Sequence, residues 1–457
     1  MADPPLRDTT TPSNETTTSI DPNDLPNQPK PPSPQLKAPL NYLYVISQFI
    51  ILLSLLPYHA IIYSIFPQKR PRSSWTLLDS VFMPAVQRYL SMMDTAGFKI
   101  SARDVFSDPG KLSLRNFASG CNFEWMEGRI DEDLRCGMID DEWVKMRDKI
   151  GVFSWYRKNR RSGTETEKNL EFAKEEGELV GIFFHGGAFT HNSAHPKSQS
   201  TVMPMTIFNR DKRFISMHSV EFRLLPDYPF PAQLQDGVSV YINLLRRGVP
   251  AKHIVLMGDS SGANIALSLA RWVRDTIQEG KGEERVTVKD GEQVSWRLAD
   301  PGGLILFSPW VNPAHSFLNC EPKDYVKRTN ECDYIFEEGP FRHHLVHNLL
   351  GHHPRNLVQS PYLSPGREGV PPHTFIDHPP CFISYGTGER GQAECERLVE
   401  YLRRDGTHVE VVRTEDTPHD ILLLGFWKRE QREEIWKGAL NFLKGIPRGG
   451  DQSMSRV

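Results

Sequence analysis

Hydrophobic positions are distributed unevenly along this chain: one isolated apolar block lies near the N-terminus, and short apolar runs alternate with amphipathic stretches after residue 178. Six of the short runs are apolar almost throughout, which is typical of strands buried on both faces. The stretches between them repeat apolar residues at helical spacing. The expected strands are 179–184, 213–217, 253–257, 303–307, 381–385 and 408–412, and the expected helices are 197–208, 232–246, 262–275, 391–404 and 433–444. This alternation predicts an α/β fold with a mostly parallel sheet and helices on both of its faces.

The apolar block near the N-terminus predicts a membrane helix. No Asp, Glu, Lys or Arg occurs between Lys37 and Lys69, and the segment 42–66 is predominantly apolar. A 25-residue helix is about 37 Å long, more than the ~30 Å hydrocarbon core of a bilayer. We therefore expect a single-pass anchor at 42–66, kinked at Pro57 because proline removes a helical hydrogen bond. The alternatives are a hairpin lying in one leaflet and a helix that caps the α/β domain.

Composition divides the rest of the chain. Residues 1–40 are rich in proline and threonine and hold no aromatic residue, so we expect a disordered tail there. Residues 75–178 mix apolar and charged positions without a chemical signature and are expected to form an N-terminal helical cap and a linker. The α/β domain is then expected over 179–446, and a flexible C-terminal tail over 447–457.

The balance of charge gives no support to nucleic-acid binding. The 54 basic and 57 acidic residues leave a formal net charge of −3, whereas a dedicated nucleic-acid binder needs a basic surplus or patch. Lys69, Arg70 and Arg72 follow the apolar block, so the positive-inside rule leans towards a cytosolic position for the C-terminal part. This difference rests on few charges and leaves the side of the membrane open; the membrane that we expect is that of the endoplasmic reticulum.

Cysteine and histidine spacing gives no metal site. The six cysteines fit neither a disulfide scaffold nor a CxxC zinc motif, and Cys320 and Cys332 would pair only in an oxidising compartment. His343 and His347 are one helical turn apart, a spacing that can bind a metal, but no carboxylate or cysteine pattern completes a site. We therefore expect neither a metal nor a cofactor.

The first chemical signal is the segment Gly258-Asp259-Ser260-Ser261-Gly262, which lies between an expected strand and an expected helix. A serine on so sharp a turn takes a strained backbone conformation and is lifted clear of the sheet, and small residues on both sides avoid clashes. We expect Ser260 to be a nucleophile. An ordinary strand-to-helix turn is the alternative.

The second signal is His185-Gly186-Gly187, directly after the expected strand 179–184. Backbone N–H groups in a glycine-rich turn can come close to a substrate and stabilise negative charge on a carbonyl oxygen. We expect Gly186, Gly187 and the backbone N–H of Ser261 to form such an oxyanion hole. The alternative is a turn that binds nothing.

The third signal is a pair of residues that each follow an expected strand, Glu389 and His419. A nucleophilic serine needs a base, and the imidazole of that base needs an acid to orient it. The chain order serine, acid, histidine is the one found in open α/β sheets of this kind. Rival acids are Asp405, which lies in an expected turn, and Asp416 and Asp420, which are too near His419 in sequence to orient it easily.

These motifs together resemble the hormone-sensitive lipase branch of the α/β-hydrolases. That branch has a His-Gly-Gly-Gly loop, a Gly-Asp-Ser-Ala-Gly elbow, and a Tyr-Arg-Leu-Ala-Pro-Glu segment that leads into Pro-Phe-Pro-Ala. The corresponding segments here are Phe222-Arg223-Leu224-Leu225-Pro226-Asp227, Pro229-Phe230-Pro231-Ala232 and the similar Ser308-Pro309-Trp310. This chain departs from the branch where Ala188 replaces the last loop glycine, Ser261 replaces alanine, and Glu389 replaces the usual Asp-Pro-Leu acid.

The resemblance implies ester hydrolysis through an acyl-enzyme, with Ser260, Glu389 and His419 as the triad and an N-terminal cap over the pocket. The anchor before the hydrolase is similar to fungal sterol-deacetylase-like members, so we expect a small apolar ester and membrane lipid as partners, with the oligomeric state open. An amidase or formamidase with the same triad is one alternative. A ligand-binding pseudo-hydrolase is another, although plant hormone receptors of that kind lack the base that His419 supplies. We also expect residues 1–74 to be dispensable for catalysis, because every catalytic candidate lies after residue 180.

Overall fold

The computed structural model describes residues 35–98, 120–157, 177–289, 292–315, 332–335 and 340–446. The expected C-terminal tail and most of the expected N-terminal tail lie outside these residues, as does Cys320. The fold is therefore built from the six described ranges.

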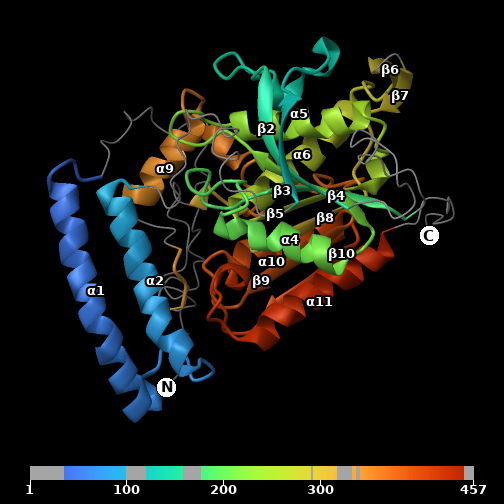
Figure 1. The fold of residues 1–457 in the computed structure, drawn as a ribbon. Helices are drawn as coiled ribbons and strands as arrows, with labels where there is room; N and C mark the ends of the chain where they lie inside the picture. The colour runs from blue at the N-terminus through green and yellow to red at the C-terminus, as the bar shows by residue number, and fades with distance from the viewer. Residues whose placement is uncertain are drawn as a thin grey trace, which may run out of the picture.

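An eight-stranded sheet forms the centre of the α/β domain (Figure 1). Its strands are β1 (Cys121–Glu127), β2 (Lys149–Tyr156), β3 (Leu179–Phe184), β4 (Phe214–Glu221), β5 (Ile254–Asp259), β8 (Gly303–Phe307), β9 (Cys381–Gly386) and β10 (Val409–Thr414). They lie in the order β1-β2-β4-β3-β5-β8-β9-β10, and the pairs from β4 to β10 are parallel. Each of the six predicted runs forms a strand of this sheet, so the predicted α/β fold is confirmed.

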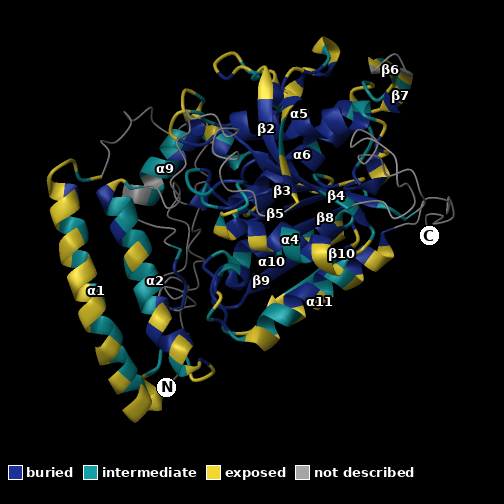
Figure 2. Cartoon of the chain, in the orientation of Figure 1, coloured by how far each residue is buried: buried dark blue, intermediate teal, exposed yellow. Residues whose placement is uncertain are grey.

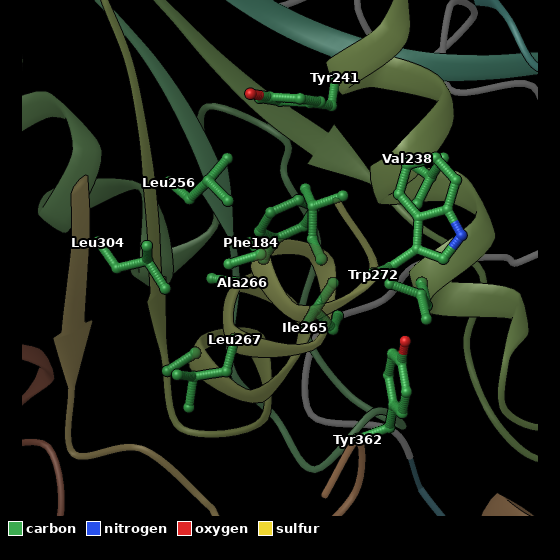
Figure 3. Packing of buried hydrophobic residues seen from close by; sticks show 14 of the residues in the cluster. Phe184, Val238, Tyr241, Leu256, Ile265, Ala266, Leu267, Trp272, Leu304 and Tyr362 are labelled. Carbon is green, nitrogen blue, oxygen red and sulfur yellow. The ribbon is translucent and has the colours of Figure 1, made fainter. Parts of the chain in front are cut away.

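Helices cover both faces of the sheet, and alternate strand residues point to opposite sides. The helices are α4 (Val202–Arg210), α5 (Ala232–Arg246), α6 (Ser261–Gln278), α9 (Pro340–Leu350), α10 (Gln392–Arg404) and α11 (Arg429–Gly445). Val180, Ile182 and Phe184 of β3 join one buried cluster with residues of α5, α6 and α10, part of which Figure 3 shows. Leu179 and Phe183 join a second cluster with residues of α4 and α11.

The region 75–178 is more than a cap and a linker, because it supplies two strands of the sheet. β1 and β2 pair antiparallel from Cys121 opposite Trp155 to Glu127 opposite Lys149, and β2 joins β4 antiparallel. The domain boundary expected at residue 179 is therefore too late. Polar and apolar residues alternate only briefly in β1, as in an edge strand with one solvent-exposed face. So short an alternation is hard to recognise in a sequence with many charged residues on both sides. The hairpin of β6 (Glu284–Lys289) and β7 (Glu292–Arg297) was also not predicted.

The apolar block forms one helix, α1 (Leu40–Ile65), which continues through Pro57. It lies antiparallel beside α2 (Leu77–Ala96), away from the sheet, and its outer surface is largely exposed (Figures 1 and 2). Helix α1 is long and apolar enough to cross a membrane, and none of its most apolar stretch is buried. The two helices are joined by a hydrogen bond from Arg88 to Gln48 and one from Asn41 to the carbonyl of Ala96.

The segment that leads into α2 is fixed to the α/β domain through Asp416. Trp75 is buried, packs edge-to-face against Trp427, and donates from its indole N–H to the carbonyl oxygen of Asp416 at 2.7 Å. Ser74 donates to the carboxylate of the same residue at 2.8 Å, and Arg72 lies 3.9 Å from it. These contacts run against the expectation that residues 1–74 are dispensable, since Arg72 and Ser74 belong to that segment.

Candidate active site

Ser260 lies on the sharp turn between β5 and α6. Its backbone has φ of +51° and ψ of −119°, a conformation that non-glycine residues rarely adopt. The flanking glycines are required by space: a Cβ on Gly258 would come within 2.4 Å of the Gly262 backbone, and a Cβ on Gly262 within 2.1 Å of the Phe184 carbonyl. The local sequence therefore dictates this turn, and Ser260 is presented at the C-terminal edge of the sheet.

The glycine-rich loop after β3 lies against this turn, but not in the way that the sequence predicts. The N–H of Gly186 donates to the Asp259 carboxylate at 2.9 Å, so it is engaged within the protein. Gly187 has φ of +112°, where a side chain would be strained. Within the described residues, no hydrogen bond occupies the N–H of Gly187, nor that of Ser261 at the start of α6. The Gly186 N–H therefore holds the loop to Asp259, and the N–H groups of Gly187 and Ser261 remain as the predicted oxyanion donors.

Glu389 and His419 are brought together across the ends of β9 and β10. His419 Nδ1 lies 3.1 Å from Glu389 Oε2, and the glutamate is 1% exposed. The other oxygen, Oε1, accepts hydrogen bonds from the Gly386 N–H at 2.6 Å and from the Ser308 hydroxyl at 2.7 Å. A carboxylate held this way fixes the proton of the imidazole on Nδ1 and leaves Nε2 as the basic nitrogen.

The rival acids have other contacts. Asp405 accepts hydrogen bonds from the backbone of His373 and Phe375, and Asp416 accepts from Ser74. Among the described residues, Glu389 is the carboxylate that is hydrogen-bonded to the His419 ring. No hydrogen bond within the described part of the chain links Ser260 Oγ to His419, and such bonds often tighten only when a substrate is bound.

Two residues that support this pair were not predicted as site residues. Asp333 accepts hydrogen bonds from the backbone N–H of His419 at 3.1 Å and of Arg390 at 2.8 Å. Burial and the nearby Glu389 charge raise the pKa of Asp333 to about 6. No sequence motif surrounds Asp333. Ser308, in contrast, begins the family-like segment Ser308-Pro309-Trp310, which could have indicated its role.

The charge of His419 depends on the carboxylates around it. Burial lowers the pKa of this imidazole, but the hydrogen bond and charge of Glu389, with the charges of Asp333 and Asp259, outweigh burial and raise it above the usual value of 6.5. The edge of Tyr334 lies against the ring, with centroids 5.9 Å apart. The nearby cavity is lined in part by the apolar side chains of Trp310 and Ile335.

Helix α9 carries His343 and His347, the pair with metal-binding spacing. In the described ranges, no three side chains of His, Cys, Asp or Glu are grouped so that they could hold a metal ion.

Comparison with curated proteins finds an acetyl-hydrolase and a receptor among the relatives of this chain. An acetyl-hydrolase of Streptomyces hygroscopicus is 25% identical over 237 residues, which are 52% of this chain and 66% of that protein. Gibberellin receptor GID1B of Arabidopsis thaliana is 34% identical over a stretch that covers 29% of this chain and 44% of the receptor. The chain thus spans less than two thirds of the length of either relative.

A solved structure and a family model give the fold and the family. A hyperthermophilic esterase from the archaeon Pyrobaculum calidifontis has the same fold, with a TM-score of 0.50 and 18% identity over 73% of this chain and 88% of that one. The family model for the alpha/beta hydrolase fold matches residues 181–423, more than half of the chain. The motifs around Ser260 resemble those of the hormone-sensitive lipase branch, and the chain belongs to the α/β-hydrolase fold family.

Proposed function

We propose that the protein is a serine hydrolase of carboxylic esters. The observation that carries this proposal is the 3.1 Å contact between His419 Nδ1 and Glu389 Oε2, at the sheet edge where Ser260 is presented on its strained turn. An oriented imidazole and a serine hydroxyl at the same edge of the sheet are the groups that acyl transfer needs.

In this proposal, Ser260 Oγ attacks the ester carbonyl carbon while His419 Nε2 takes the hydroxyl proton. The N–H groups of Gly187 and Ser261 hold the oxyanion of the tetrahedral intermediate. The carbonyl re-forms, the C–O bond to the alcohol breaks, and His419 gives the proton to the leaving alkoxide. A water molecule then attacks the acyl-enzyme with the same base, which releases the carboxylic acid and restores Ser260. Glu389 keeps the imidazole oriented and stabilises its charged form.

The test is hydrolysis of p-nitrophenyl acetate and butyrate, compared with the anilide of the same acyl group. The acetyl-hydrolase relative supports the ester, and we expect the two esters to turn over far faster than the amide. Faster amide cleavage would favour an amidase with the same triad. Binding of the esters without turnover would favour a ligand-binding pseudo-hydrolase, the alternative suggested by the receptor relative. The presence of His419 favours hydrolysis instead.

The pH dependence of this turnover follows from the charge of His419. Because its pKa is raised above 6.5, we expect kcat/KM to rise with pH through that higher value, as the base becomes neutral. Asp333→Asn removes one of the negative charges that raise this pKa and keeps an oxygen for the His419 N–H, so the acidic limb should move to lower pH. Asp140→Asn, at an exposed position, is the control. An unchanged limb in Asp333→Asn would contradict this electrostatic account.

We further propose that α1 attaches the protein to a membrane and that the substrate is an apolar, lipid-dissolved ester. The outer residues of α1 support this, because Leu43, Ile46, Ile50 and Leu53 are each more than half exposed. So large an exposed apolar surface is costly in water and is normally covered by lipid or protein. Similarity to sterol-deacetylase-like esterases and a location in the endoplasmic reticulum remain predictions.

The membrane proposal predicts that full-length protein resists extraction with alkaline carbonate. Leu43→Lys with Ile50→Lys should release it into the soluble fraction, because lysine in hydrocarbon is costly. The matched control is Val286→Lys with Val288→Lys, two exposed apolar residues on the distant β6–β7 hairpin, which should stay in the membrane fraction. Full-length protein that is soluble without detergent would refute the attachment.

A further inference from the structure

Two carboxyl groups beside the candidate triad have no explanation in the mechanism above. Asp259 precedes Ser260 and is 1% exposed, and Asp420 follows His419 and is 2% exposed. Among the described residues, no donor reaches Asp259 Oδ2 or either oxygen of Asp420, so three buried carboxyl oxygens have no hydrogen-bond partner. Burial is the main cause of the raised pKa of both groups, and each carboxyl group lies near enough to the other to shift its pKa as well. Two carboxylates offer only acceptors, so a hydrogen bond between them requires a proton on one of the two.

The pair lies within a chain of hydrogen bonds that surrounds the site. On one side, Asp259 Oδ1 accepts from the Gly186 N–H, which places the oxyanion loop. On the other side, the backbone N–H of Asp420 donates to Ser308 Oγ at 3.0 Å, and the Ser308 hydroxyl donates to Glu389, the partner of His419. A hydrogen bond between the two buried carboxyl groups would join these two halves.

We propose that Asp420 is a positioning residue that works with its carboxyl group protonated, donating to Asp259 and so fixing the loop of the catalytic histidine to the nucleophile turn and the oxyanion loop. This role rests on the proposed ester hydrolysis. It assigns a task to Asp259 as well, which accepts from the Gly186 N–H with one oxygen and from Asp420 with the other.

The surroundings favour a single shared proton. Burial, followed by the charge of Asp259 and that of Glu389, raises the pKa of Asp420 well above its ordinary value, and burial also raises that of Asp259 to about 6. The other titratable groups that face the pair are His419, which favours a negative charge on Asp259, and Tyr334, whose own pKa is raised. Loss of the shared proton at high pH would leave two carboxylates in contact, and they would repel each other.

Stability should therefore depend on pH in a defined direction. The folded protein holds a proton on Asp420 at a pH where the unfolded chain has lost it, so stability falls as pH rises from the ordinary carboxyl pKa through the raised one. Turnover should fall at the alkaline end of that range, when the link between the two loops breaks.

The experiment compares Asp420→Asn, Asp420→Gly and the exposed control Asp140→Asn in full-length protein. Asp420 has φ of +47°, which asparagine tolerates and glycine adopts freely, so neither change strains the backbone. Asparagine keeps a donor for Asp259 that cannot ionise, whereas glycine removes the link. The readouts are kcat and KM on p-nitrophenyl acetate and thermal unfolding, each from neutral to alkaline pH.

We expect Asp420→Gly to lower kcat on the order of 10²-fold with a smaller change in KM, as misplacement of catalytic groups does. Asp420→Asn should restore most of kcat, lose the alkaline limb of the wild type and unfold with less dependence on pH. Equal kcat and pH profiles in wild type and Asp420→Gly would overturn the proposal, as would an Asp420→Asn variant as impaired as the glycine variant. If the wild type hydrolyses no ester, the proposed function fails, while the unfolding curves still decide whether Asp420 carries the proton.

Discussion

Replacing Ser260 by alanine is expected to lower kcat on p-nitrophenyl esters by about 10⁶-fold, the loss that follows removal of the nucleophile from a serine hydrolase. The reason is that no other described group takes its place on the turn between β5 and α6, and the oxyanion donors alone give little rate. Folding should be unaffected, because alanine removes only a hydroxyl that has no hydrogen bond in the described structure. Steady-state assays with a thermal unfolding curve on the same sample measure both.

The matched control for this variant is Ser295→Ala, on the exposed strand β7. It should keep wild-type kcat. Residual turnover in Ser260→Ala within about tenfold of the control would mean that another residue supplies the nucleophile, since even the loss of one oxyanion donor costs more than this.

Replacing Glu389 by glutamine is expected to lower kcat by about 10⁴-fold, the effect of neutralising the acid that orients a catalytic histidine. The amide has nearly the shape of the carboxylate and can keep the contacts with Ser308 and Gly386, so the protein should stay folded. What it loses is the charge that holds the Nδ1 proton and stabilises the imidazolium. The measurement is kcat on p-nitrophenyl acetate at a pH above the acidic limb of the wild type.

The decisive comparison is Asp416→Asn, a rival acid near His419 in sequence that has no hydrogen bond to its ring. Asp416 bonds to Ser74, so its neutralisation should cost much less than that of Glu389. A crippled Asp416→Asn variant beside a nearly normal Glu389→Gln variant would show that the assignment of the acid is wrong.

Most of the sheet could be predicted because each buried parallel strand is apolar on both faces. The runs 179–184 and 303–307 coincide with β3 and β8 for this reason, and helix 232–246 coincides with α5. The turn at Ser260 could also be predicted, because its backbone conformation demands glycine at fixed neighbouring positions.

The features that could not be predicted depend on contacts between distant segments of the chain. Strand β1 mixes polar and apolar residues, and it belongs to the sheet only because it pairs with β2, which in turn pairs with β4. The N–H of Gly186 donates to the carboxylate of Asp259, 73 residues away, and no local motif indicates this hydrogen bond. Asp420 is too near His419 in sequence to orient it easily, and the sequence does not reveal that it lies near Asp259, whose charge, after burial, raises its pKa.

The central claim is that Ser260 is an activated nucleophile, and covalent labelling with a fluorophosphonate tests it most directly. Folded full-length protein is treated with the probe, and the modified residue is located by peptide mass spectrometry. The account predicts a single adduct on Ser260, formed far more slowly in His419→Gln and absent in Ser260→Ala. Folded protein that carries no adduct on Ser260, or a Ser260→Ala variant that is labelled as fast as the wild type, would contradict it.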